Sequence, residues 1–501
     1  MTSSDRRRWW ALSALALAML VIGLDSTVLT VAVPTLAQDL GASTSQLQWI
    51  NTSYTLVLAA ALLPAGALGD RYGRRRLMLG ALALFGAASV ACAYAGSAGT
   101  LIIARAVLGL AAAALIPMSM AVLPVLFPVQ RERSKALTIW VTSMAIGLPL
   151  GPVLGGWLLD NYWWGSIFLI NVPFIIVTVG AVLAFIPESR NADAGPLDWP
   201  GVALSSTGLL VLTYGLIRAG EQGWTDGLVW ICLTGATALL AVFVRWQRRA
   251  VYPLIDLSLF GSRGFTWGTI FATTVNFAMF GIFFVTPQYF QAVLGVDALG
   301  SGLRLLPLIA GLVIGTRVAD RIARHLGAGI VLAIGFTLLT AGLVAGATTA
   351  LGTGYGFTAG WIAVVGAGMG CVLPTAMGVA IDELSVDRAG SGSALIQALR
   401  QAGGTIGVAI LGTVLNTAYQ SGLGELDRPP FSTGVMQGVT AAAHLGRPDL
   451  VESVQDAFVH GMSVLLWVSA AICAAGAVLA LNRMPLRRTA DQKDRGQSIH
   501  A

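Results

Sequence analysis

Long apolar stretches alternate with short polar segments along the whole chain of 501 residues. Fourteen stretches come close to, or exceed, the roughly 20 residues that a helix needs to cross a bilayer. The tenth is short and the thirteenth is weakly apolar. The pattern predicts an all-α membrane protein with fourteen membrane-spanning helices. The predicted spans are 11–33, 48–68, 77–95, 100–125, 136–158, 165–186, 199–218, 227–246, 265–287, 301–316, 328–349, 357–381, 401–419 and 457–481.

The basic residues gather in every second segment between spans. With the N-terminus inside, 25 of the 30 Lys and Arg residues fall inside, among them Arg400, which we assign to the loop before the thirteenth span. This asymmetry predicts a cell-membrane protein, expected in a bacterial inner membrane, with both termini cytoplasmic. The longest loop, residues 420–456, lies outside, where we expect a mobile cap. The five exceptions to the split are Arg105, Arg218, Arg304, Arg428 and Arg447.

The composition agrees with a membrane protein and excludes several other classes. The chain is 56% hydrophobic and 11% charged, whereas soluble domains carry about 25% charged residues. The net charge of +6 follows from the membrane topology, so it indicates no nucleic-acid partner. The four cysteines and four histidines lack metal-ligand spacing. Neither lysine belongs to the Gly-Lys pair of a phosphate-binding loop. We therefore expect no metal, no cofactor and no ATP-driven or enzymatic chemistry.

A weak repeat divides the chain into halves. Asp70 and Arg71 follow the second span, and Asp320 and Arg321 follow the tenth, 250 residues later. Secondary transporters are often built from such repeats. The repeat predicts an N-terminal six-helix bundle over residues 1–190 and a C-terminal six-helix bundle over 263–482. Two inserted helices occupy 191–262, and a cytoplasmic tail follows from 483 to 501.

Two charged residues and one amide stand inside apolar spans. A carboxylate such as Asp25 is costly there and functional by default, and its desolvation favours protonation. Counted from the outer helix ends, Asp25 lies at a depth of ~12 Å and Arg105 at ~8 Å, at 1.5 Å per residue. We expect Asp25 and Arg105 to serve proton coupling or substrate binding, and Asn276 to line a cavity. The alternatives are a structural carboxylate, a snorkelling arginine and an amide used in packing.

Two glycine-rich motifs indicate helices that pack closely and move against one another. Residues 66–76, between spans two and three, read GALGDRYGRRR; their glycines allow close helix approach and their acid can accept charge-assisted hydrogen bonds. Residues 147–156 in span five read GLPLGPVLGG, which places three glycines on one helix face and a proline that bends the helix. The alternatives are a plain basic loop and a purely structural seam. The candidate residues are Gly66, Asp70, Arg71, Gly73 and Arg74 in the loop, which we expect to act as a gate, and Gly147, Gly151, Pro152, Gly155 and Gly156 in span five.

These motifs resemble those of a known family. Residues 66–76 are similar to the signature loop of the major facilitator superfamily, and residues 147–156 to its antiporter motif. Residues 24–34, LDSTVLTVAVP, resemble the first-helix motif of its drug:proton antiporters. FLINVP at 168–173 and LDWPG at 197–201 resemble the fourteen-span branch, the EmrB/QacA type. Residues 163–166 read WWGS where many relatives carry Trp-Arg-Trp, which is closer to quaternary-ammonium exporters.

The resemblance implies the major facilitator fold and a function. We expect a proton-coupled secondary exporter of drugs, antibiotics or other amphipathic small molecules, cations included, that works as a monomer in the lipid bilayer by alternating access. In the family, the arginine matching Arg105 is implicated in proton transfer. The alternatives are an importer or uniporter of a small metabolite and a membrane sensor of transporter ancestry.

The topology can be tested by cysteine labelling. In a chain without its native cysteines, Gly354→Cys and Gly434→Cys are expected to react with an impermeant maleimide added to intact cells. Gln492→Cys is expected to react only after permeabilisation, because the tail is basic and remains inside. Labelling of Gln492→Cys in intact cells would contradict the predicted orientation.

Overall fold

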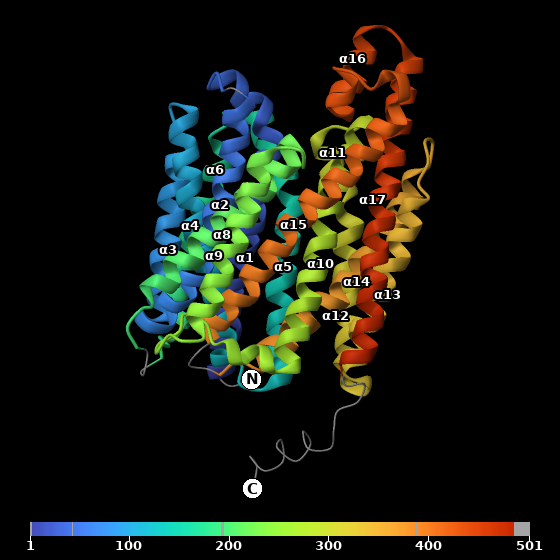
Figure 1. Ribbon diagram of the computed structural model, residues 1–501. Helices are drawn as coiled ribbons and strands as arrows, with labels where there is room; N and C mark the ends of the chain where they lie inside the picture. The colour runs from blue at the N-terminus through green and yellow to red at the C-terminus, as the bar shows by residue number, and fades with distance from the viewer. Residues whose placement is uncertain (1–2, 43, 192–194, 386–388, 485–501) are drawn as a thin grey trace.

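The computed structural model describes residues 3–42, 44–191, 195–385 and 389–484. In these ranges all regular structure is helical, and long helices run side by side from one end of the molecule to the other (Figure 1). Thirteen stretches are long and apolar enough to cross a membrane, and α10, with 26 residues, coincides with the ninth predicted span. The all-α fold with fourteen spans is confirmed. The predicted tail from residue 485 onward lies outside the described residues.

The first half of the chain forms α1 to α7, and the inserted pair is α8 and α9. The second half begins at α10 and ends with α17. The elements are α1 (Ser3–Asp39), α2 (Thr44–Tyr72), α3 (Arg74–Ala93), α4 (Ala98–Leu126), α5 (Gln130–Asn161), α6 (Ser166–Leu169), α7 (Asn171–Phe185), α8 (Trp199–Gln222), α9 (Gly227–Gln247), η1 (Leu257–Gly261), α10 (Arg263–Gln288), η2 (Tyr289–Val293), α11 (Ala298–Arg304), α12 (Leu306–Leu326), α13 (Ala328–Ala347), α14 (Tyr355–Asp382), α15 (Ala389–Leu423), η4 (Gly424–Leu426), η5 (Phe431–Thr433), α16 (Val435–His444) and α17 (Pro448–Arg483).

The two halves repeat the same helix pairing. In the first half α1 packs along α5 and α7, while α4 packs along α2 and α3. In the second half α10 packs along α15 and α17, while α14 packs along α12 and α13. Helices α1 and α10 therefore occupy equivalent places, as do α5 and α15. The start of α1 and the end of α17 lie at the same end of the bundle, called the terminal end here; the other is the opposite end (Figure 1).

The thirteenth span is longer than predicted, and this corrects the assignment of Arg400. Helix α15 begins at Ala389, so Arg400 lies eleven residues inside it and not in a loop. The segment before Arg400 contains Ser393 and Gln397, and both are buried. These side chains face other helices, so the segment needs little apolarity. A hydropathy window detects helix faces that contact lipid, and this segment has few of them.

The long outer segment is also more regular than expected. Residues 420–456 contain the end of α15, the short helices η4, η5 and α16, and the start of α17. The hydroxyl of Tyr419 donates to the carbonyl of Phe431 at 2.8 Å, and Val435 and Val454 are buried. This helical structure in residues 420–456 was not predicted from the sequence, where the segment was interpreted as a loop although it contains apolar residues spaced for helix packing.

The inserted helices α8 and α9 contact both halves. Asp198 caps α8 by accepting from the backbone of Gly201 at 2.9 Å, and it also accepts from Gln247 of α9 at 2.7 Å. Trp49 of α2 stacks on Tyr214 of α8, with ring centroids 6.0 Å apart. Beyond the end of α8, Trp224 donates to Thr413 of α15 at 2.6 Å.

A glycine face joins α5 to α1. A Cβ added at Gly147 would collide with the backbone of Leu20, and one at Gly151 with the side chain of Thr27. Thr27 also donates to the carbonyl of Leu148 at 2.7 Å, so the two backbones lie in direct contact. Gly155 continues this face. Helix α5 runs through Pro152 without a break, whereas Gly156 faces open space and lies off the seam.

The seam can be tested with two matched substitutions on one helix. Gly151→Leu is expected to destabilise the protein by about 1–3 kcal/mol, the usual cost of overpacking, because it forces α1 and α5 apart. Gly156→Leu adds the same side chain where nothing lies within 4 Å and should be nearly neutral. Thermal unfolding in detergent compares them, and equal losses would remove the case for a seam at Gly151.

Candidate functional site

The centre of the first half contains a buried ion pair. Nη1 of Arg105, from α4, donates to Oδ2 of Asp25, from α1, at 2.8 Å. Both side chains are fully buried. Asn171, the first residue of α7, donates to the other carboxylate oxygen at 3.0 Å. Three helices therefore meet at one carboxylate.

The cation is held in place as well. The Arg105 guanidinium lies 4.5 Å from the ring centroid of Tyr54, a cation–π distance. Its Nε points to the carbonyl of Ile50 at 3.4 Å. Removing one partner of such a buried pair leaves an uncompensated charge, which is strongly destabilising. A proton added to Asp25 would have the same electrostatic effect, so the cluster can couple protonation to a rearrangement of α1 against α4.

Sequence reasoning placed Asp25 and Arg105 at similar depth but did not single out Asn171 as a partner. The sequence feature that could have indicated Asn171 is its position as an amide inside the apolar stretch 165–186. Asn276 lies elsewhere, on α10 in the second half, where its Nδ2 donates to the backbone carbonyl of Arg400 at 2.7 Å. The structure therefore separates the three predicted intramembrane residues into two centres.

Asp70 joins the two halves at the terminal end. Its Oδ1 accepts from the backbone N–H of Gly390 at 2.9 Å and its Oδ2 from that of Ser391 at 2.7 Å, in the first turn of α15. A carboxylate there is stabilised by unpaired N–H groups and the helix dipole. Arg74 donates to the same carboxylate at 2.7 Å from within α3. One side chain thus connects α2, α3 and α15.

The other loop residues shape this junction. A Cβ at Gly66 would lie 2.8 Å from the carbonyl oxygen of Gly390, so glycine permits α2 and α15 to touch. Gly73 has a φ of 112°, which favours glycine. Arg71 donates to the carbonyl of Gly195 at 2.8 Å, which ties the loop to the linker before α8.

A second contact closes the terminal end on the other side of the bundle. Asp382, the last residue of α14, accepts from Arg133 at 2.7 Å and from Gln130 at 2.6 Å, both in the first turns of α5. The two contacts, α2 with α15 and α5 with α14, both have to break before the halves can separate here.

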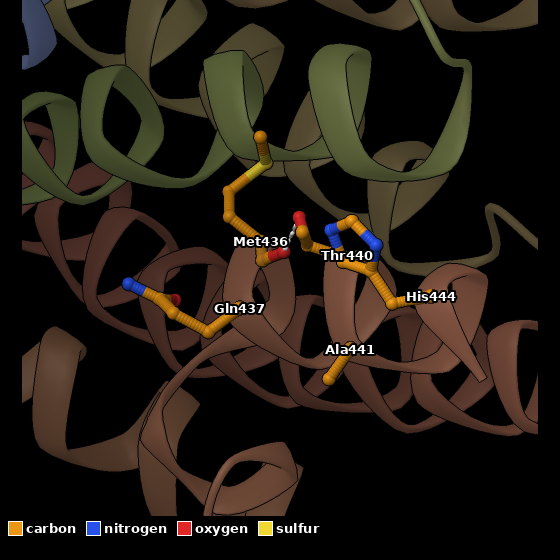
Figure 2. Close-up of a pocket in the computed structure, with 5 residues that line it drawn as sticks. All are labelled: Met436, Gln437, Thr440, Ala441 and His444. Carbon is orange, nitrogen blue, oxygen red and sulfur yellow. Dashed lines mark hydrogen bonds between the residues drawn. The ribbon is translucent and has the colours of Figure 1, made fainter.

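The surface pockets lie away from these centres. One, of about 410 Å³, covers one side of α16, where Thr440 and His444 project together while Gln437 points away (Figure 2). The other, of about 760 Å³, follows α8 and α9 to a cluster of three arginines. Neither is lined by the predicted site residues. The first is lined by Met436, Gln437, Thr440, Ala441 and His444, and the second by Leu212, Thr237, Leu240, Ala241, Val244, Arg245, Arg248 and Arg249.

Within the described ranges, no three His, Cys, Asp or Glu side chains gather into a metal site. The four cysteines are buried and unpaired.

Comparison with known proteins finds relatives over nearly the whole chain. The multidrug efflux pump LfrA of Mycolicibacterium smegmatis is 32% identical over 502 residues, covering 95% of this chain and 96% of the relative. The tetracenomycin C resistance and export protein of Streptomyces glaucescens is 30% identical, covering 95% and 91%. The methyl viologen resistance protein SmvA of Salmonella typhimurium is 29% identical, covering 95% and 97%.

The family comparison and the solved structures agree with one another. The model of the Major Facilitator Superfamily matches residues 15–408. The proton:xylose symporter XylE has a TM-score of 0.66 at 14% identity, covering 96% of this chain and 97% of XylE. A bacterial homologue of the human lysosomal transporter Spinster has a TM-score of 0.60 at 18% identity, covering 95% and 97%. Because these sequence identities are low, the solved structures show the fold of this chain and nothing about its substrate.

Asp70→Asn is expected to leave the protein inserted but to slow transport by roughly tenfold, the effect of losing about 1.4 kcal/mol of charge-assisted bonding. The amide has one acceptor oxygen where the carboxylate has two, so the α2–α15 contact weakens.

A cysteine at Ala394, which is fully buried beside Gly66, can report this change. Ala394→Cys should react with a maleimide faster in the Asp70→Asn background. Asp160→Asn, at an exposed carboxylate near the end of α5, is the control. If cysteine reactivity and transport turnover are unchanged in Asp70→Asn, residues 66–76 only set the topology and do not act as a gate.

Proposed function

Because the chain belongs to the major facilitator superfamily, we propose that it exports drugs or similar amphipathic small molecules in exchange for protons. The single observation that carries the proton coupling is the buried Asp25–Arg105 pair with its Asn171 donor. The relatives named for resistance and export favour efflux over the importer and uniporter alternatives. The work is transport, with no covalent step.

The proposed orientation places the terminal end in the cytoplasm. Arg7 and Arg8 at the start of α1, and Arg483 at the end of α17, lie at this end, which agrees with the positive-inside rule. The protein then spans the bacterial inner membrane as a monomer surrounded by lipid, with α16 on the outside.

Alternating access follows from the contacts between the halves. The first-half and second-half bundles rock about a central site, as in other repeat-built transporters. In this structure the Asp70 and Asp382 contacts close the proposed cytoplasmic end. Release of both contacts admits substrate from the cytoplasm, and their return accompanies discharge to the outside.

Asp25 links this motion to protons. The carboxylate is fully buried in this conformation, so exchange with water takes place in another one. Protonation removes its charge, weakens the bond to Arg105 and loosens α1 against α4. Because α1 is held to α5 along the glycine face, movement at Asp25 is passed to α5 and on to the Gln130 and Arg133 contacts with Asp382.

The energy available is sufficient for useful export. One proton crossing about 100 mV releases roughly 2.3 kcal/mol, equivalent to a concentration gradient of roughly 50-fold. The test of the function is a substrate panel in inverted vesicles, in which uptake of at least one drug is expected to require a proton gradient. Uptake unaffected by a protonophore would contradict proton coupling.

Asp25→Asn is expected to abolish uphill, pH-driven uptake into inverted vesicles while downhill exchange survives. The amide has nearly the size of the carboxylate but cannot titrate, so the step that uses the proton gradient is lost. Asp25→Glu restores a titratable group and should recover part of the uphill rate. Uphill uptake at the wild-type rate in Asp25→Asn would rule out Asp25 as the coupling residue.

A further inference from the structure

The second half contains a half-buried cation that the proposed proton step does not use. Arg400 lies eleven residues inside α15, ~16 Å from its first residue at 1.5 Å per residue, in a helix long and apolar enough to cross a membrane. An ionisable residue at this position is functional by default.

Among the described residues, the hydrogen bonds of this guanidinium go to neutral atoms. Nη1 donates to Oε1 of Gln397 at 2.9 Å and lies 3.5 Å from the sulfur of Met377. Nη2 lies 3.4 Å from Oδ1 of Asn276. Nε has no acceptor in the described part of the chain. A guanidinium carries five N–H donors, so hydrogen-bonding capacity is left for a ligand.

The helices whose side chains contact Arg400 and Gln397 supply no counter-ion. Across these helices, α4, α10, α14 and α15, the sequence contains one acidic residue, Asp382. It ends α14 and is paired with Arg133. Among the described residues no ion pair involves Arg400, whereas Arg105 has a carboxylate at 2.8 Å.

The internal repeat makes the contrast sharper. Asp25 and Asn276 are 251 residues apart, against 250 for Asp70 and Asp320, and α1 and α10 occupy equivalent places in their halves. At the place on α10 that corresponds to Asp25 on α1, the second half has an amide, although the arginines near the two positions lie on helices that are not equivalent, α4 and α15. One centre is electrically complete and the other carries a net positive charge.

Arg400 also lies at the boundary between the halves, where transporters of this architecture hold substrates. One turn earlier on α15, Gln397 donates to the sulfur of Met120, from α4 in the first half, at 3.4 Å. Arg400 remains partly exposed. The thioethers of Met120 and Met377 give the region an adaptable apolar wall.

We propose that Arg400 binds an anionic group of the exported molecule, so that the preferred substrates are aromatic or amphipathic organic acids carrying a carboxylate or phenolate. The proposal rests on the export function above and names its substrate class. A planar guanidinium is well matched to such oxygens, and a quaternary cation is repelled there. This proposal differs from the expectation of cationic substrates that residues 163–166 suggested.

An electrical consequence follows. A monovalent anion leaving in exchange for one entering proton moves two charges in the direction that an inside-negative potential favours. A monovalent cation exchanged for one proton moves none. Transport of the proposed substrates should therefore accelerate when a potassium–valinomycin gradient sets the potential.

The experiment uses the full chain in proteoliposomes with two xanthene dyes of opposite charge, fluorescein as the anion and rhodamine 6G as the cation. The wild type is expected to concentrate fluorescein under a proton gradient in preference to rhodamine 6G. Arg400→Gln should raise the KM for fluorescein at least tenfold, while Arg400→Lys retains most of the affinity. Asn276→Asp should weaken fluorescein transport similarly. The new carboxylate beside Nη2 would pair with the guanidinium and compete with the anionic substrate, while Arg400 itself stays in place.

Arg304→Gln is the matched control, since it removes a cation that lies over the Tyr355 ring at the opposite end and should leave both dyes unaffected. Preference for rhodamine 6G, equal handling of the dyes, transport of neither, or an unchanged fluorescein KM in Arg400→Gln would each overturn the assignment. Proton-driven transport of rhodamine 6G alone would leave the export function standing while this inference fails. Loss of any response to protonophore would instead count against the proton-coupled function.

Discussion

A charge in the middle of a bilayer has to find its partner inside the protein, because hydrocarbon supplies neither water nor counter-ions. This constraint explains the arrangement of the first half. Asp25 and Arg105 lie on helices that are distant in sequence, and Asn171 and Tyr54 complete their surroundings. Four of the seven helices of that half are positioned around one carboxylate, so a change in its protonation affects the packing of the whole bundle.

Close backbone contact transmits such a change. On the α5 side of its contact with α1, the glycine face has no side chain that would absorb a shift. At the terminal end, Gly66 and Gly390 allow α2 and α15 to touch, and Asp70 holds them by hydrogen bonds to backbone N–H groups. Contacts of this kind are made or broken as units, which suits a protein that alternates between two arrangements and does not deform continuously.

The two halves share a helix pairing but have different charges at their centres. The first has an internally neutralised pair, suited to binding and releasing a proton. The second has Arg400 among amide and thioether groups. We propose that the two halves have distinct tasks, the proton step in the first and recognition of an anionic substrate in the second.

The sequence by itself determined the membrane class, the fourteen spans, the family and the depth of Asp25 and Arg105, because apolar length, basic-residue asymmetry and local motifs are properties of neighbouring residues. Tertiary structure decided which polar groups meet. Helices that are far apart in the chain bring Asn171 next to Asp25, Asp70 to the first turn of α15 and Asp382 to the first turns of α5. The same packing leaves Arg400 without a counter-ion among the described residues. Hydropathy failed at residues 389–400 for the same reason: it measures preference for lipid, whereas this stretch of α15 is surrounded by protein. The pairing of buried charges is a property of three-dimensional packing, and no local pattern along the chain encodes it.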